Sequence, residues 1–199
     1  SSGFEKVELH ADVVDVSGVP VSVSSSPNLK MTVANQSLFV RIGTDNKVAS
    51  GDGIYTKLWV AKVTDAAGNA VPGVTVQFRL RPRTNDWAYR TGYWFSLPGA
   101  TTWSSTETAT CLNEDSNLNG ILDPGEDKNG NDQLTPGNVA GVSGDAVTDS
   151  DGFAQGKVSY PKSMANWAAV TVRAVVQVSG TEFWDEASFI LPILNDDIK

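Results

Sequence analysis

The chain has 199 residues, of which 40% are hydrophobic and 19% are charged, a balance typical of folded globular proteins. Its net charge of −8 argues against partners that attract basic proteins, namely nucleic acids and anionic membrane surfaces, and makes divalent cations a natural partner. The sequence contains no apolar run long enough to span a bilayer, so we expect no membrane insertion.

Catalytic residue types are scarce. Cys111 and His10 are the only cysteine and the only histidine, which argues against an internal disulfide, a thiol protease, a Ser-His-Asp triad and zinc sites rich in Cys or His. Acidic pairs can be drawn from many positions, but none lies in a recognisable strand-end context for glycoside hydrolysis. We therefore expect no enzymatic activity. Cys111 is expected to be a free residue beside a loop, an intermolecular bridge, or a partner for another part of a longer parent protein.

Residues 1–35 contain two strand-like pieces, at 7–16 and 29–33. They are expected either to complete the edge of a sandwich or to end a preceding domain, and the pattern favours neither. Residues 36–199 are expected to form one domain.

Alternation of apolar and polar residues indicates strands at 54–63, 74–80, 169–178 and 181–191, separated by turn-forming Asp, Asn and Gly. No segment has the period of an amphipathic helix. The predicted fold is therefore an all-β, immunoglobulin-like antiparallel β-sandwich. Its core is expected to contain the apolar members of the alternating runs, with Trp59 facing outward or under an insertion. These members are Leu58, Val60, Val74, Val76, Phe78, Val170, Val172, Ala174, Val176 and Phe189.

The strand pattern stops after Leu80 and returns near Ala146, which predicts an insertion at about 81–145 between two strands. Its first part is rich in arginine and aromatic residues. Four rings there, Trp87, Tyr89, Trp94 and Trp103, are candidates either for a platform that stacks on sugars or for packing of the insertion onto the sandwich. Exposed rings would favour the first interpretation and buried rings the second.

Residues 115–126 (DSNLNGILDPGE) match the spacing of a twelve-residue calcium loop, with Gly120 at the sharp turn. Ca²⁺ binds six to eight hard oxygens at about 2.3–2.6 Å, and alternate short side chains on a curved backbone can supply them. Pro124 and Gly125 stand where an exiting helix would begin, so the segment resembles the helix-poor loops of dockerin-like or thrombospondin-type repeats rather than a full EF-hand. The predicted ligands are Asp115, Asn117, Asn119, the carbonyl of Ile121, Asp123 and Glu126.

The pattern recurs twelve residues later, in residues 127–138. Asp132 replaces the turn glycine and Asn138 replaces the closing glutamate, so the second loop is expected to bind more weakly. The six acidic residues of 114–132 face Lys128 alone, which gives a local net charge of −5 and favours a cation. The alternative to a calcium site is an ordinary loop, in which Asp, Asn and Gly occur together because they form loops well. The predicted ligands of the second loop are Asp127, Asn129, Asn131, Gln133, Thr135 and Asn138.

Two segments carry a family resemblance. Residues 59–78 (WVAKVTDAAGNAVPGVTVQF) and 147–154 (VTDSDGFA), followed by the alternating run 169–178, resemble the bacterial Ig-like domains of the invasin/intimin type. The resemblance covers roughly 36–80 and 146–192, and the insertion departs from it. It implies a sandwich module of a surface or secreted protein, often tandemly repeated, without catalytic residues.

Together these features predict a non-enzymatic, calcium-binding Ig-like module of a bacterial cell-surface or secreted protein, with a structural or adhesive role. Its expected location is extracytoplasmic, and its expected partners are calcium, neighbouring domains of a longer parent chain, and a surface protein or glycan. The alternative is a calcium-assisted carbohydrate-binding module.

Overall fold

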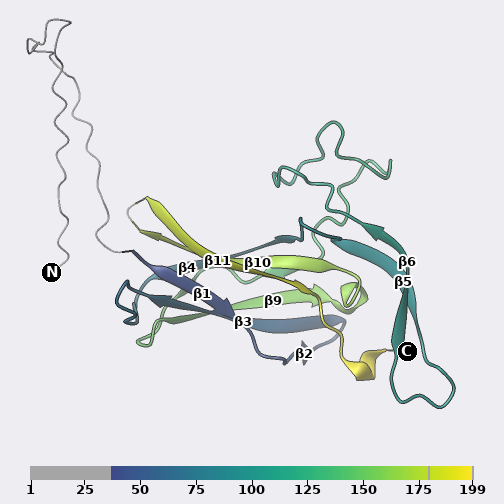
Figure 1. Ribbon diagram of the computed structural model, residues 1–199, viewed down its shortest axis with the longest axis horizontal. Coiled ribbons are helices and arrows are strands. Elements are labelled where there is room, and N and C mark those ends of the chain that lie inside the picture. The colour runs from purple at the N-terminus through teal and green to yellow at the C-terminus, as the bar shows by residue number, and fades with distance from the viewer. Residues whose placement is uncertain (1–36, 179, 199) are drawn as a thin grey trace, which may run out of the picture.

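The computed structural model describes residues 37–178 and 180–198. The predicted strands at 7–16 and 29–33 lie outside these residues. The described part of the chain is built from antiparallel strands and two short 3₁₀ turns, which confirms the predicted all-β class (Figure 1). No helix in this part of the chain has the length and apolar character needed to cross a membrane.

Two sheets form a β-sandwich. The first has the order β1-β3-β9-β7, with β2 also paired to β3, and the second has the order β11-β10-β4-β8. The strands of the first sheet are β1 (Phe39–Gly43), β2 (Ala49–Ser50), β3 (Ile54–Thr64), β7 (Gly141–Val142) and β9 (Phe153–Pro161). The strands of the second sheet are β4 (Thr75–Pro82), β8 (Ala146–Val147), β10 (Ala169–Val178) and β11 (Thr181–Ile190).

The core lies between the two sheets, where one parity of β3 and of β9 is buried and β10 is buried at both parities along most of its length. The rings of Trp59 on β3 and Phe189 on β11 are 5.0 Å apart across this space. Most of the predicted core is confirmed: Val76, Phe78, Val170, Val172, Ala174 and Val176 are buried, and Val74 and Phe189 pack against them.

The predicted register of β3 is wrong. Trp59 is buried at 4% exposure, whereas Leu58 is 46% exposed and Val60 is only half-buried. Both parities of this strand are rich in apolar residues, and Lys57 makes the inward parity look polar. Lys57 nevertheless points inward, because its ammonium group donates a hydrogen bond to the carbonyl of Asp45. The larger aromatic side chain occupies the core, since it buries more apolar surface.

Between β4 and β7 the chain leaves the sandwich. A third sheet is formed there by the hairpin of β5 (Tyr89–Phe95) and β6 (Ser104–Cys111). In Figure 1 this hairpin lies at one end of the sandwich, and the polar loops that follow β6 project away from it. Arg90 on β5 fixes the base of the hairpin, because its side chain donates to the carbonyl and the side-chain oxygen of Asn166 at 2.8 and 2.9 Å.

Candidate metal centre

The two predicted calcium loops lie in sequence between the end of β6 and the return of the chain to β7. We call residues 115–126 the first loop and residues 127–138 the second loop. Among the described residues of these loops there is no helix and no strand; each loop is shaped instead by hydrogen bonds from backbone amides to Asp, Asn and Glu side chains.

Asp115 organises the turn of the first loop. Its two carboxylate oxygens accept hydrogen bonds from the amides of Asn119 and Gly120, at 3.0 and 2.9 Å. The side-chain oxygen of Asn117 accepts from the amide of Asn119 at 3.0 Å, and that of Asn119 accepts from the amide of Ile121 at 2.7 Å. These bonds curl the backbone so that alternate side chains point to one side.

Three predicted ligands of the first loop meet at one point. The side-chain amides of Asn117 and Asn119 both lie 2.7 Å from the same oxygen of Asp123. The nitrogens face this oxygen because the amide oxygens of Asn117 and Asn119 accept from the backbone amides of Asn119 and Ile121. The structure therefore brings together the side chains of positions three, five and nine of the loop.

The second loop repeats this geometry with an offset of twelve residues. Asp127 accepts from the amides of Asn131 and Asp132 at 3.1 and 3.0 Å, as Asp115 does from their equivalents. The side-chain amides of Asn129 and Asn131 lie 2.7 and 3.3 Å from the hydroxyl of Thr135, the counterpart of Asp123. The amide of Gln133 donates to the side-chain oxygen of Asn131 at 2.9 Å, so Gln133 holds the place of Ile121.

The backbone conformations also repeat. Leu118 and Gly120 have positive φ angles of 63° and 76°, and their counterparts Gly130 and Asp132 have φ angles of 72° and 58°. Gly125 and its counterpart Gly137 also have positive φ angles, of 91° and 65°, so each loop makes three left-handed steps and places glycine at two of them. Asp132 adopts the turn conformation that the sequence pattern reserved for glycine, which a short Asx side chain tolerates better than most.

Two buried glutamates close the loops. Glu126 is 6% exposed, and its carboxylate accepts from the amides of Ser116 and Asp123 at 2.9 and 3.0 Å. Glu114 is 5% exposed and accepts from the amides of Lys128 and Thr135 at 3.0 and 2.8 Å. The donating amides stand at positions two and nine of each loop. Glu114 therefore does for the second loop what Glu126 does for the first. The ligand pattern of a single loop did not contain Glu114 or the hydroxyl of Ser116.

These bonds keep the carboxylates ionised. The hydroxyl of Ser116, followed by the amide of Asp123, lowers the pKa of Glu126 below its ordinary value. The amide of Asp132 is the largest of the backbone donors that lower the pKa of Asp127. Both side chains are therefore anionic at neutral pH and able to attract a cation.

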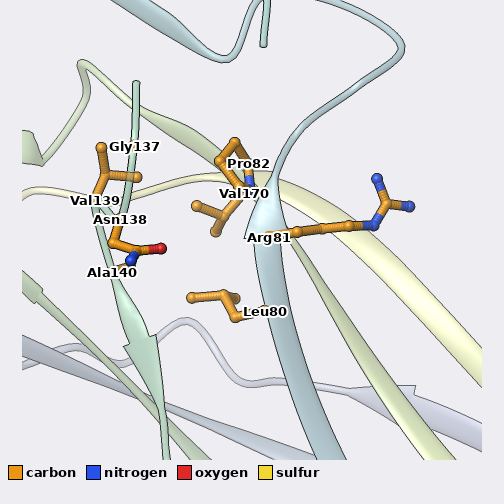
Figure 2. A pocket seen from close by; sticks show the side chains of 8 residues that line it. All are labelled: Leu80, Arg81, Pro82, Gly137, Asn138, Val139, Ala140 and Val170. Carbon is orange, nitrogen blue, oxygen red and sulfur yellow. The ribbon is translucent and has the colours of Figure 1, made fainter. Parts of the chain in front are cut away.

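Asn138 lies elsewhere. It lines a small pocket beside β4, together with Leu80, Pro82 and Val170, at the place where the chain returns to the sandwich. Figure 2 shows Asn138 on the segment that faces β4, with its side chain directed into the pocket between them. Glu114, and not Asn138, accepts from the amides of Lys128 and Thr135 in the second loop.

The donor chemistry of the first loop fits a hard cation. It combines two aspartates, two asparagines, a glutamate and an available carbonyl, all of them oxygen donors. No three His, Cys, Asp or Glu side chains form a metal-holding group by themselves within residues 37–178 and 180–198. A cation in these loops would thus depend on amide and carbonyl oxygens as well, which suits Ca²⁺ better than Zn²⁺.

The aromatic rings of the insertion mostly face protein. The guanidinium groups of Arg83 and Arg90 each lie 4.5 Å from the ring of Trp87. Trp94 meets Trp167 edge-on at 5.8 Å. Tyr89 packs against the core, and Trp103 alone of the four predicted rings is exposed, at 38%.

No family model, curated protein or solved structure matches the chain.

Proposed function

We propose that this chain is a non-enzymatic, calcium-binding, Ig-like module of a bacterial cell-surface or secreted protein, with a structural or adhesive role. The observation that carries the proposal is the repetition of one hydrogen-bonded loop geometry at a spacing of twelve residues, in which Asp115 and Asp127 take the same place. If Asp, Asn and Gly had gathered here by chance, the amides at positions five and six would not be expected to donate to the aspartate at position one in both loops.

Calcium would act on the insertion through linkage. Ion binding to the folded loops stabilises them by mass action, and a site of millimolar affinity suffices where external calcium is millimolar. The sandwich has its own apolar core, so we expect calcium to order the insertion and to leave the sheets unchanged. This favours an extracytoplasmic location and a place among neighbouring domains of a longer chain.

A calcium-assisted glycan-binding module is the alternative. It has less support, because two arginines already lie against the ring of Trp87 and Trp167 packs against Trp94. The exposed ring of Trp103 would have to carry most of the stacking on a sugar. A glycan array screened with and without calcium separates the two functions.

The calcium proposal predicts heat and a thermal shift when the chelator-treated protein is titrated with CaCl₂. Asp115→Ala should weaken binding by at least about tenfold, because it removes a charged ligand and two bonds that shape the first loop. Mg²⁺ should compete poorly, since six ligands that offer seven oxygens, with both oxygens of Glu126 counted, form a loop too large for its octahedral shell.

The matched control is Asp132→Ala, which removes the same charge from an exposed position whose side chain is not a predicted ligand. It should weaken binding less than Asp115→Ala. Equal effects of the two substitutions, or no heat at millimolar calcium, would contradict the proposed site.

A further inference from the structure

The first loop is closed by its own last residue, Glu126, but the second loop is closed by a carboxylate from outside it. Glu114 precedes the first loop in sequence, yet it accepts from the amides of Lys128, Asn129 and Thr135 in the second loop, at 3.0, 3.2 and 2.8 Å. Its own amide donates to the carbonyl of Thr135 at 3.0 Å, so backbone and side chain hold the second loop together.

Each Glu-Asp pair therefore serves both loops. Glu126 closes the first loop, and its neighbour Asp127 organises the turn of the second. Glu114 closes the second loop, and its neighbour Asp115 organises the turn of the first. When either loop becomes ordered, it fixes one residue of the Glu114–Asp115 pair and one of the Glu126–Asp127 pair. The peptide bond within each pair then restricts the other residue, which belongs to the other loop's hydrogen bonds.

We propose that the two loops form one coupled unit, in which Glu114 closes the second loop and calcium binding to one loop favours binding to the other. This inference rests on the proposed calcium function for its ligand, but the closing of the second loop by Glu114 is testable without metal. Glu114 is a positioning residue here: both its oxygens are engaged with backbone amides, and it acts by holding Lys128, Asn129 and Thr135 in place.

The coupling has a physical basis in burial and charge. Both glutamates are more than nine-tenths buried beside Asp115 and Asp127. Buried carboxylates are held by several amide donors, and hydrogen bonds to a charged acceptor are about twice as strong as neutral ones. A cation near either aspartate also lowers the cost of the negative charge on its neighbouring glutamate.

The test is residue-resolved amide hydrogen exchange on the full chain, with chelator and with calcium, for the wild type, Glu114→Gln, Glu126→Gln and the control Asp132→Asn. Without calcium, Glu114→Gln should accelerate exchange about tenfold or more at Lys128, Asn129 and Thr135. Glu126→Gln should do so at Ser116 and Asp123. The control, which removes an equal charge at an exposed side chain, should change neither set.

With calcium, the wild type should bind two ions with a Hill coefficient above one, and Glu114→Gln should reduce both the affinity of the second loop and the coefficient. Acceleration by Glu114→Gln only in the first loop, or independent binding by the wild type, would overturn the coupling. Failure of the wild type to bind any calcium would overturn the proposed function, and the calcium-free exchange pattern would still decide whether Glu114 closes the second loop. Thermal melting of the sandwich should be the same for all four proteins.

Discussion

At the scale of single residues, the error in the register of β3 shows what alternation can and cannot predict. Val76 on β4 and Val172 on β10 were placed correctly, because polar residues occupy the opposite parity of their strands. On β3 both parities are apolar, and the outcome depends on what faces them. Gly156 lies opposite Trp59 on the neighbouring strand, and the ring of Phe78 on the other sheet packs against its bare backbone, a contact that no local pattern reveals.

Gly156→Ala tests this packing. A Cβ at this position would lie 2.6 Å from the ring of Phe78, which is too close for contact, so the core has to shift. We expect a loss of about 1–3 kcal/mol in the free energy of unfolding, measured by chemical denaturation. Gly144→Ala is the control, because a Cβ there meets no atom within 4 Å, and it should change stability by less than about 0.5 kcal/mol.

At the scale of elements, the sequence predicted features that depend on neighbouring residues and missed those that depend on residues far apart in the chain. Spacing alone located both loops, because the bonds of Asp115 reach only four and five residues along the chain. Glu114 was missed as a closing residue because its partner Thr135 lies 21 residues away. The β5-β6 hairpin was also missed, since a bulge at Thr91 and Gly92 interrupts its alternation.

Arg90 is the residue that joins this hairpin to the sandwich. Its side chain is 11% exposed, donates to Asn166 and lies 4.5 Å from the ring of Trp87. Arg90→Met keeps the apolar stem and removes the donors, and we expect the free energy of unfolding to fall by about 1.5–3 kcal/mol. The control is Arg79→Met, whose ion pair with Glu182 is half-exposed and should contribute less than about 1 kcal/mol. Equal losses in the two variants would show that the hairpin is held in another way.

At the scale of the whole molecule, the C-terminal segment ties the two sheets together. After β11 the chain crosses to the first sheet, where Asp197 accepts hydrogen bonds from the hydroxyl of Tyr55 and the ammonium group of Lys162. The bond from Tyr55, and then that from Lys162, lower the pKa of Asp197 below its ordinary value. The carboxylate form is thus favoured in the folded state, and folding is stabilised only where this group is ionised.

This sign sets the pH dependence. Because the folded pKa is depressed, the contribution of Asp197 is complete above about pH 4, the ordinary range of aspartate, and is lost as the pH falls through the lowered value. The melting temperature of Asp197→Asn should therefore lie below that of the wild type at pH 7, and the two should converge in more acidic solution. Asp196→Asn, at the exposed neighbouring position, should follow the wild type throughout. A difference that does not shrink as the pH is lowered below the ordinary range of aspartate would assign the effect to packing.

The amide of Glu114 donates to the carbonyl of Thr135, so the chain enters and leaves the paired loops at the same place. The contact between Glu114 and Thr135 thus offsets the entropic cost of closing the loop, and the flanking strands do not have to offset it. The paired loops thus form a cassette, by which we mean an insertion whose two ends are held together at Glu114 and Thr135. Such a cassette could be lengthened, shortened or moved to the hairpin of another sandwich without altering the register of the sheets, because the separation of its two ends is set within the cassette itself.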